Sequence, residues 1–318
     1  MSKYNCKLTK DNMQKDKTIV REIRHLITYN CNLKCLHCYL SAGEHSDIKT
    51  NQFSQKEANK FYDYFKPETI SVTGGEPLLY PRLVKILARS TAKYNGKLEL
   101  VTNGLLLTPK LLNELNDLNP NISYQISLDG NEKFHDYLRQ KKGAYKGGAI
   151  KAIDLCSASR KLVKARMTVT PKNYNQIQTV INRLDKFERK NIKLIMRAAL
   201  DKGRAHKNNL SFGNDFVKEL EKFKKKSKFI DISITERCGY CLDSISVDPS
   251  GEIYPCCYFV FNPEYKMGNM FNPQKLERHP DFLNYTGKCF AVEKFSKFPP
   301  KSRCKSCIDK KLLKPAKE

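Results

Sequence analysis

Three cysteines near the amino end carry the clearest chemical signal in this sequence. Cys31, Cys35 and Cys38 follow a C-x3-C-x2-C spacing, directly after a short apolar run that predicts a strand. Cysteine thiolates are the ligands of iron–sulfur clusters, and a short loop with this spacing can bring three sulfurs to three corners of a 4Fe–4S cube. The fourth iron then has no protein ligand. An open position on a redox cluster can chelate a substrate or cofactor and pass it an electron.

Two other interpretations of this loop stay open, a zinc knuckle and a group of buried structural cysteines. Zinc sites usually combine two C-x2-C units that lie close together. The single loop from Cys31 to Cys38 therefore favours a cluster over zinc.

The loop, followed by Tyr39, resembles the signature of the radical SAM enzymes. The resemblance implies that the free iron is chelated by the amino and carboxylate groups of S-adenosylmethionine. It also implies that the reduced cluster breaks a C–S bond of this cofactor and generates the 5′-deoxyadenosyl radical. An external electron donor, flavodoxin or ferredoxin, is expected to supply the electron.

Length and cysteine content limit the class of protein. The 318 residues suffice for one large domain and a small one. The start of the chain is polar and Lys-rich, and no apolar run reaches the length of about 20 residues that spans a membrane. Twelve cysteines without a secretion signal indicate a reducing compartment and metal ligation. We therefore expect a cytoplasmic protein with no membrane partner.

The formal charge of +25 predicts an acidic partner: a leader peptide, a nucleic acid or an anionic surface. Thiolates bound to iron reduce this charge, because a cluster with its ligands is net negative. The longest basic run, Lys222 to Lys228, is typical of the solvated face and end of a helix. We therefore favour a peptide over a nucleic acid.

Alternating strand and helix patterns predict the fold. Strands are expected at 24–28, 69–73, 97–101, 122–128, 162–169 and 192–197. Helices are expected after Ser54, from Pro81, after Thr108, from about 145, at 176–190 and at 212–226. Successive units of this kind form a parallel sheet with right-handed crossovers, and six are too few for the closed eight-fold barrel. We therefore expect an α/β fold, a laterally open, partial (β/α)6 TIM-like barrel with its chemistry at the carboxyl ends of the strands.

Short motifs at these strand ends match radical SAM positions. The run from Gly74 to Pro77 resembles the GGE motif, in which backbone and glutamate hold the ammonium of the cofactor. Ser127 to Gly130 resembles the S-x-D-G element, and Arg139 matches the arginine that pairs with the cofactor carboxylate, with a surface arginine as the alternative. A guanidinium fork suits a carboxylate. The resemblance thus gives the following cofactor-binding residues: Tyr39, Gly74, Gly75, Glu76, Thr102, Asn103, Ser127, Asp129, Arg139 and Val169.

A second group of cysteines lies near the carboxyl end: Cys238, Cys241, Cys256, Cys257, Cys289, Cys304 and Cys307. Two of them bracket Gly251 as C-x9-G-x4-C, and residues 246–254 predict a hairpin with its turn at 249–251. The pattern resembles the SPASM or twitch extension, which holds auxiliary 4Fe–4S clusters in peptide- and protein-modifying radical SAM enzymes.

The resemblance implies one auxiliary cluster, because the SPASM cysteine pattern is incomplete after the hairpin. Its expected ligands are Cys256, Cys304 and Cys307, with Cys238 or Cys241 as the fourth. A zinc ribbon of Cys238, Cys241, Cys304 and Cys307 is the alternative. The expected organisation is an arm at 1–18, the partial barrel at 19–228 and a small Cys-rich SPASM/twitch domain at 229–318. Cys156 is expected in the core, because free cysteine is commonly buried.

The run from Gly251 to Cys257 resembles one in radical SAM peptide epimerases, where the first cysteine binds the auxiliary cluster and the second is a free thiol. Neighbours on an extended strand point to opposite sides, which argues against two ligands here. Cys257 would then donate a hydrogen atom to a substrate Cα radical. A packed cysteine or an alternative ligand are the other interpretations.

Together these resemblances imply a radical SAM enzyme that abstracts hydrogen from a ribosomally made precursor peptide. Epimerisation is one expected outcome; thioether or C–C cross-linking and protein maturation are alternatives. A molybdenum-cofactor-type cyclase shares the core and part of the cysteine pattern. A basic iron–sulfur or zinc protein that binds nucleic acid is the non-enzymatic alternative.

Overall fold

The computed structural model describes residues 20–45, 48–212, 219–224, 226–227, 229–234 and 244–277. The expected arm at 1–18 lies outside these residues. Within the described ranges, no helix combines the length and the apolar character that crossing a membrane requires.

One sheet of ten strands organises the described chain, in the order β10-β9-β8-β1-β2-β3-β4-β5-β6-β7. All six predicted strands occur: β1 (Glu22–Leu26), β2 (Thr69–Thr73), β3 (Lys97–Thr102), β4 (Ile122–Ser127), β5 (Val163–Val169) and β6 (Ile192–Ala198). They pair in parallel with their chain neighbours, and β7 (Asp231–Ile234) continues the parallel sheet beyond β6. The α/β prediction, with a mostly parallel sheet consistent with a partial barrel, is confirmed.

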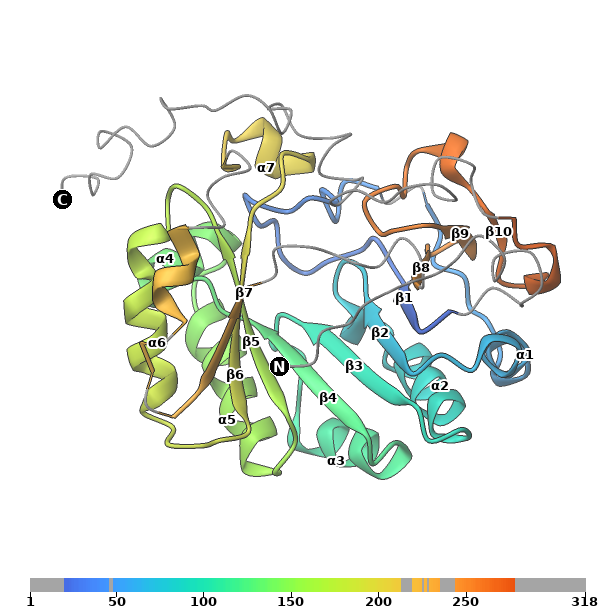
Figure 1. The fold of residues 1–318 in the computed structure, drawn as a ribbon, viewed down its shortest axis with the longest axis horizontal. Coiled ribbons are helices and arrows are strands. Elements are labelled where there is room, and N and C mark those ends of the chain that lie inside the picture. The colour runs from blue at the N-terminus through green and yellow to red at the C-terminus, as the bar shows by residue number, and fades with distance from the viewer. Residues whose placement is uncertain are drawn as a thin grey trace, which may run out of the picture.

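The region after the parallel sheet returns to its other edge. Strand β8 (Ser244–Val247) pairs in parallel with β1, and β9 (Glu252–Tyr254) and β10 (Gly268–Asn269) follow in antiparallel order. The predicted hairpin is therefore confirmed, with Ser246 opposite Tyr254. Asp248 stabilises its turn, because its Oδ1 accepts hydrogen bonds from the backbone of Ser250 and Glu252, each at 2.9 Å. Figure 1 shows these strands at the β1 side of the sheet.

Helices cover the outer face of the curved sheet (Figure 1). They are α1 (Gln55–Phe65), α2 (Pro81–Ala92), α3 (Pro109–Leu118), α5 (Lys151–Ala158) and α6 (Ile177–Asp185). The predicted capping box of α1 is present, with Glu57 N donating to Ser54 Oγ at 3.2 Å and Ser54 N donating to Glu57 Oε2 at 2.7 Å. The helix start predicted at Ser54 is therefore confirmed. The start predicted at Thr108 is confirmed as well, because Thr108 Oγ1 accepts a hydrogen bond from Leu111 N.

Two helix predictions differ from the structure, and one helix was missed. A short helix, α4 (Glu132–Arg139), was not predicted, and the helix expected from 145 begins as a π-helical turn at Ala144–Ile150. Helix α6 ends at Asp185 rather than 190, because the chain turns at Glu188, whose φ is 52°, before entering β6. Of the helix expected at 212–226, residues 213–218 and 225 lie outside the described ones, 219–220 are helical and a 3-10 turn follows at Glu221–Phe223.

Alternation along the strands separates an apolar outer face from a polar inner face. On β5, Val163, Ala165, Met167 and Val169 are fully buried in the main core. Burying an aliphatic side chain of this kind stabilises the fold by about 1.5–3 kcal/mol. The intervening residues of β5 are polar and line a cavity on the inner face. Cys156 is also fully buried in this core, as predicted.

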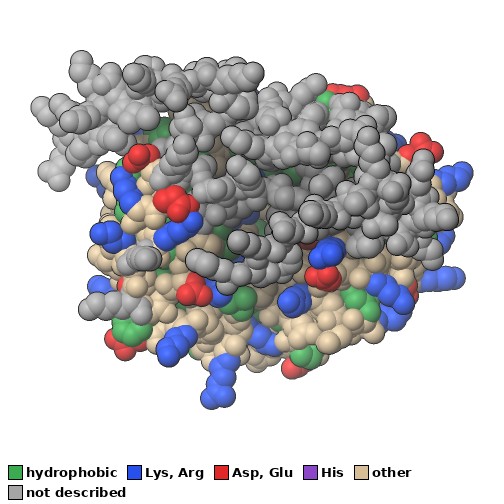
Figure 2. Space-filling view, in the orientation of Figure 1, with side chains coloured by type: hydrophobic (Ala, Val, Ile, Leu, Met, Phe, Trp, Pro, Cys, Tyr) green, Lys and Arg blue, Asp and Glu red, His purple; other side chains and the backbone are tan. Residues whose placement is uncertain are grey.

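Surface charge is dispersed in the view of Figure 2. Lys and Arg side chains are spread over the described part of this face, with Asp and Glu among them. Elsewhere among the described residues, several lysines pair with acidic neighbours, such as Lys93 with Asp63 at 3.0 Å and Lys85 with Glu114 at 2.6 Å. The described part of this face therefore shows no continuous basic stripe of the kind that follows a nucleic-acid backbone.

Candidate active site

A cavity of about 400 Å³ lies between the inner face of the sheet and the cysteine loop, residues 31–39. Its volume is in the range of sites for small organic ligands. Strands β1 to β6 all contribute side chains to it, and most of these side chains are polar. A polar inner face is unusual for a packed barrel and suits a ligand-binding site.

The thiols of Cys31, Cys35 and Cys38 all line this cavity. Each sulfur accepts a hydrogen bond. The backbone of Leu33 donates to Cys31, Arg139 Nη1 donates to Cys35 at 3.6 Å, and the backbone of Ala42 donates to Cys38 at 3.4 Å. Burial raises the pKa of Cys31 to about 12 and also raises that of Cys35. Metal binding must therefore release protons here, and the N–H donors are suited to the thiolates that remain.

The cysteine loop does not form a site for one metal ion. Among the described residues, no three His, Cys, Asp or Glu side chains are arranged to hold a single ion. The thiolates of a 4Fe–4S cluster each bind a different iron, so they need no common centre. The donor set of the loop therefore fits a cluster with one open iron.

Two glycines after β2 allow the cysteine loop to lie against the sheet. A Cβ on Gly74 would lie 2.3 Å from the carbonyl oxygen of Thr28, and one on Gly75 would lie 2.0 Å from that of Asn30. Gly75 N also donates to Thr28 O at 2.7 Å. The glycines are thus required by contact with the chain that leads into the cysteine loop, a role that the GGE motif alone did not reveal.

Glu76 follows the glycines and is 1% exposed. Its Oε1 accepts from Thr102 Oγ1 at 2.7 Å and from Leu78 N at 3.0 Å, and its Oε2 accepts from Asn103 N at 2.9 Å. Burial raises the pKa of Glu76, and these hydrogen bonds oppose that effect. A carboxylate can accept about four hydrogen bonds. Glu76 therefore has capacity for a ligand ammonium in the cavity that it lines.

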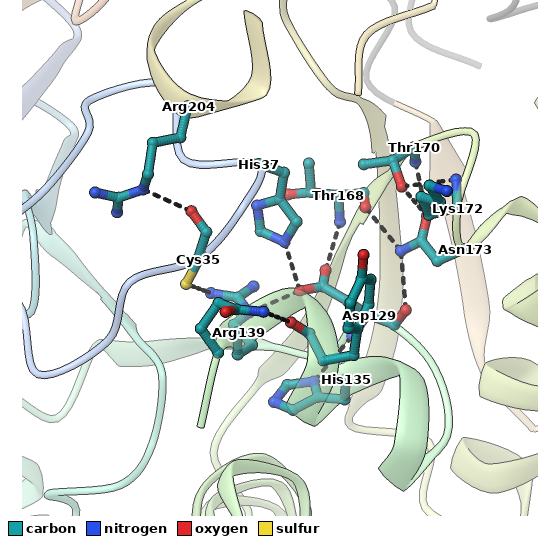
Figure 3. A network of polar contacts seen from close by, with 12 residues as sticks. Cys35, His37, Asp129, His135, Arg139, Thr168, Thr170, Lys172, Asn173 and Arg204 are labelled. Atoms are coloured by element: carbon teal, nitrogen blue, oxygen red, sulfur yellow. Dashed lines mark hydrogen bonds and ion pairs between the residues drawn. The ribbon is translucent and has the colours of Figure 1, made fainter. Parts of the chain in front are cut away.

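Asp129 is the centre of a buried network behind the cysteine loop (Figure 3). Its Oδ2 accepts from Arg139 Nε at 2.7 Å and contacts His37 Nε2 at 2.9 Å, and its Oδ1 accepts from Thr168 N at 3.0 Å. Burial alone would raise the pKa of Asp129, but Arg139 and His37 hold it well below the usual range. Because Arg139 also donates to Cys35 Sγ, Asp129 orients the guanidinium that touches a predicted cluster ligand.

The same network joins β4 to β5. Asn173 Nδ2 donates to Asp129 O at 2.9 Å and to Thr168 O at 3.0 Å, and its Oδ1 accepts from Thr170 N at 2.7 Å (Figure 3). The side-chain amide of Asn173 thereby connects the backbone after β4 to the backbone of β5. This fixes Asp129, which in turn positions Arg139.

Helix α7 (Gly203–Lys207) holds the cysteine loop from the other side. Arg204 donates from Nε to Cys35 O at 2.8 Å, from Nη2 to Ala42 O at 3.0 Å and from Nη1 to Glu44 at 2.8 Å. A Cβ on Gly203 would lie 2.4 Å from Tyr39 O, so only glycine allows this approach. The run Gly203-Arg204-Ala205 thus positions the predicted cluster ligands.

Cys257 lines the cavity on the side of β1, whereas Cys256 does not line it. Arg24 Nη1 lies 3.9 Å from Cys257 Sγ, and Tyr39 contacts the same thiol. A hydrogen bond from Cys256 lowers the pKa of Cys257 well below the usual thiol value; burial opposes this effect, and Arg24 and Arg197 add to it.

The backbone at these two cysteines corrects one premise of the sequence analysis. Strand β9 ends at Tyr254, and a turn follows in which Phe259 N donates to Cys256 O at 2.9 Å. The two thiols contact each other and do not point to opposite sides of a strand. Pro255 explains the early end of the strand, because proline cannot donate to a ladder.

The structure brings most of the predicted residues together. Those that line the cavity are Cys31, Cys35, Cys38, Tyr39, Gly74, Gly75, Glu76, Thr102, Asn103, Ser127, Arg139 and Cys257. Asp129 supports them from behind, and Val169 is buried in the core without lining the cavity. Cys238, Cys241, Cys289, Cys304 and Cys307 lie outside the described residues.

Sequence reasoning missed the charged side chains on the inner face, among them Arg24, Arg166 and Arg197. The signal was present on β5, where Lys164, Arg166 and Thr168 alternate with buried apolar residues. A parallel strand covered on both faces by packed elements is usually apolar throughout. A polar residue at every second position therefore indicates a cavity on one face.

Comparisons with known proteins agree with this geometry. The family model of the Radical SAM superfamily matches residues 26–184, half of the chain. The antilisterial bacteriocin subtilosin biosynthesis protein AlbA of Bacillus subtilis (strain 168) is 28% identical over 264 residues, 77% of this chain and 56% of AlbA. The chain spans 56% or less of the length of the first curated relatives that it matches.

Solved structures share the fold. The structure of Streptococcus suis SuiB bound to precursor peptide SuiA aligns with a TM-score of 0.69 and 14% identity, over 84% of this chain and 66% of SuiB. Native anSMEcpe with bound AdoMet aligns with a TM-score of 0.61 and 19% identity, over 86% of this chain and 82% of that protein. From the family match, the shared fold and the thiol-lined cavity together, we conclude that this chain belongs to the radical SAM superfamily.

Proposed function

We propose that this protein is a radical SAM enzyme that modifies a ribosomally made peptide. One observation carries the proposal: three cysteine thiols, Glu76 and Arg139 share a single cavity with Cys257. The first five groups suit a cluster and its cofactor, and the last is a reactive group that contacts Tyr39 at the end of the cysteine loop. When bound, the 4Fe–4S cluster supplies the electron that splits S-adenosylmethionine and yields the radical that abstracts a substrate hydrogen.

The chain's own residues would bind and orient this cofactor. Cys31, Cys35 and Cys38 would each hold one iron. Glu76 would accept hydrogen bonds from the ammonium of S-adenosylmethionine, and Arg139 would bind its carboxylate. Since Arg139 Nη1 lies 3.6 Å from Cys35 Sγ, a carboxylate bound to this guanidinium would lie beside a predicted cluster ligand. Asp129 and Asn173 keep the guanidinium in place while the cofactor binds.

A peptide substrate is supported by the relatives and by charge. AlbA is named for the biosynthesis of a bacteriocin, and SuiB was solved with a precursor peptide. The net charge of +25 suits an acidic leader segment. We include in the proposal one auxiliary 4Fe–4S cluster on Cys256, Cys304 and Cys307 with Cys238 or Cys241, an external flavodoxin or ferredoxin, and a cytoplasmic location.

We further propose that the reaction is the epimerisation of a residue in the peptide, with Cys257 as the hydrogen donor. Cys257 lines the cavity and contacts Tyr39, the residue next to the predicted cluster ligand Cys38. Abstraction of the Cα hydrogen from an L-residue leaves a planar radical. A hydrogen atom from the Cys257 thiol, delivered from the other face, would give the D-residue, and the sulfur radical then requires one electron and one proton to return to the thiol.

The test uses protein reconstituted without oxygen, with dithionite, S-adenosylmethionine and peptides encoded beside its gene, in D2O. The proposal expects 5′-deoxyadenosine and a D-residue that carries one deuterium at Cα, because the thiol hydrogen exchanges with solvent. Cys257→Ala should keep the iron and still form 5′-deoxyadenosine, yet yield no D-residue.

Other outcomes of the same variant assign Cys257 differently. If Cys257→Ala loses iron, the residue is a ligand, a role consistent with the lowered pKa of its thiol. If the variant modifies the peptide normally, the reaction is a cross-link or another oxidation, since these return no hydrogen to the substrate.

A further inference from the structure

Among the described residues that line the cavity, more side chains are basic than acidic. Nine charged residues line the cavity, six basic and three acidic: Arg24, Arg139, Lys164, Arg166, Arg197, Arg204, Glu22, Glu76 and Glu99. Cations that are partly removed from water need an anion nearby, because burial penalises an unpaired charge. The cavity therefore favours a ligand with negative charge.

Most of these cations have a carboxylate from the protein itself. Arg24 pairs with Glu22 at 2.9 Å, and Lys164 pairs with Glu99. Arg139 and Arg204 pair with Asp129 and Glu44, as described above. Arg166 differs, because among the described residues no carboxylate lies within ion-pair distance of its guanidinium.

Arg166 is surrounded by further positive charge. It lies on β5 opposite Ser127 of β4 and Ile195 of β6. Arg197 is two residues further along β6 on the same face, within reach of a long side chain. Burial lowers the pKa of Arg166, and the guanidiniums of Arg197 and Arg24 lower it further. The positive charges of these three arginines therefore surround one region of the cavity.

A neutral donor faces the same cavity without an acceptor. Gln125 of β4 is 6% exposed and lines the cavity, and its Nε2 has no hydrogen-bond partner among the described residues. Gln125 lies opposite Lys164, two residues before Arg166 on the same face of β5. A buried amide donor without a partner costs about 1–3 kcal/mol, so a ligand acceptor is expected at this position.

We propose that Arg166 and Gln125, with Arg24 and Arg197 beside them, bind a carboxylate of the peptide substrate inside the cavity. The proposal rests on the proposed peptide-modifying function and adds a property of the substrate. A guanidinium fork and an amide N–H match the two oxygens of a carboxylate. In an unmodified ribosomal peptide, carboxylates are the main anionic groups.

The carboxylate of the cofactor is assigned elsewhere in the cavity. Arg139 has Asp129 and Cys35 as its main electrostatic neighbours, whereas those of Arg166 are Arg197, Tyr258, Tyr39 and Arg24. The two arginines thus belong to different groups, one beside Asp129 and Cys35 and one beside Tyr39 and Tyr258. S-adenosylmethionine has a single carboxylate, and it is assigned to Arg139. The arginines around Arg166 are therefore available for a carboxylate of the substrate.

Two randomised peptide libraries test the proposal, one with free carboxyl ends and one with amidated ends. Reconstituted enzyme with S-adenosylmethionine captures peptides from each. Wild-type protein should enrich Asp or Glu at one position in both libraries if a side chain binds, or favour the free-acid library if the C-terminus binds. Arg166→Gln should reduce that preference by about tenfold or more, the usual worth of a charged hydrogen bond.

Matched variants separate binding from folding. Arg166→Lys keeps the charge without the fork and should retain part of the preference. Gln125→Leu removes a donor that the free protein leaves unsatisfied, so it should raise the melting temperature and still weaken the preference. Arg82→Gln changes an exposed arginine on α2 and should behave as wild type.

Three results would overturn the proposal. One is a wild-type protein that captures acidic and neutral peptides equally. Another is an acidic preference that Arg166→Gln leaves intact. The third is a tenfold loss of S-adenosylmethionine affinity in Arg166→Gln, which would assign the arginines to the cofactor. Failure of the wild-type protein to form 5′-deoxyadenosine would contradict the proposed function instead, so the two failures are distinct.

Discussion

Two adjacent walls of the cavity, first the cysteine loop and second the turn at Cys257, pack in one hydrophobic cluster but present thiols in different ways. The cysteine loop is held by polar contacts from several elements: the glycines after β2, Arg139 after β4 and Arg204 of α7. The turn at Cys257 relies more on aromatic packing, with Tyr258 against Tyr39 at 4.9 Å between ring centroids, and Lys202 Nζ also donates to Tyr258 O. Directional hydrogen bonds fix atoms more tightly than ring contacts do. The comparison therefore assigns fixed ligand geometry to the loop and adaptable positioning to the turn.

The largest effect is expected from Gly75→Ala on the first wall. The new Cβ would lie 2.0 Å from Asn30 O, so the chain leading into the cysteine loop must move. We expect a destabilisation of about 3 kcal/mol or more and loss of iron from the loop. Urea unfolding and iron content measure both effects.

Gly147→Ala is the matched control for this variant. Its new Cβ would meet no atom within 4 Å, so stability should change by less than about 1 kcal/mol. Equal stability of the two variants would show that the close approach at Gly75 does not hold the loop.

A smaller loss is expected from Arg204→Gln. The carbonyl oxygens of Cys35 and Ala42 lose their guanidinium donors, which should cost about 3 kcal/mol at this buried position. Lys207→Gln is the control, because Lys207 pairs with the same Glu44 but is 63% exposed, and should cost less than about 1 kcal/mol. Similar unfolding midpoints for the two variants would refute a structural role for Arg204.

The smallest effect is expected on the second wall. Phe259 is fully buried and packs on Tyr265 at 4.6 Å between ring centroids. Phe259→Leu should cost about 1 kcal/mol, because the aromatic cluster can repack around leucine. Hydrogen exchange should accelerate at 252–261 and stay unchanged in the cysteine loop. Acceleration in both regions would show that the two walls are one cooperative unit.

Sequence patterns predicted the parallel sheet, and most of the site residues that they predicted line the cavity, because both follow from local rules. Strand periodicity located β1 to β6, and motifs at strand ends fall on one side of a parallel sheet. Contacts between distant segments could not be read this way. The pairing of His37 with Asp129 and the return of β8 to β1 depend on how the sheet curves.

Two local signals were present but unused. Asn131 before Glu132 is a helix start, and its Oδ1 accepts from Phe134 N at 3.1 Å in α4. Pro255 ends β9 before the cysteine pair. The first signal was passed over, so no helix was predicted at 132–139, and the second error came from extending the strand past the proline that terminates it.

The most direct test of the account is 5′-deoxyadenosine formation by the triple variant Cys31→Ala, Cys35→Ala and Cys38→Ala, reconstituted without oxygen and reduced with dithionite. Cys156→Ala, which alters a cysteine buried in the core away from the cavity, is the matched control. The account predicts that the triple variant keeps about half of the iron, from one remaining 4Fe–4S cluster, and forms no 5′-deoxyadenosine, while the control forms it normally. Continued cleavage of S-adenosylmethionine by the triple variant would contradict the account.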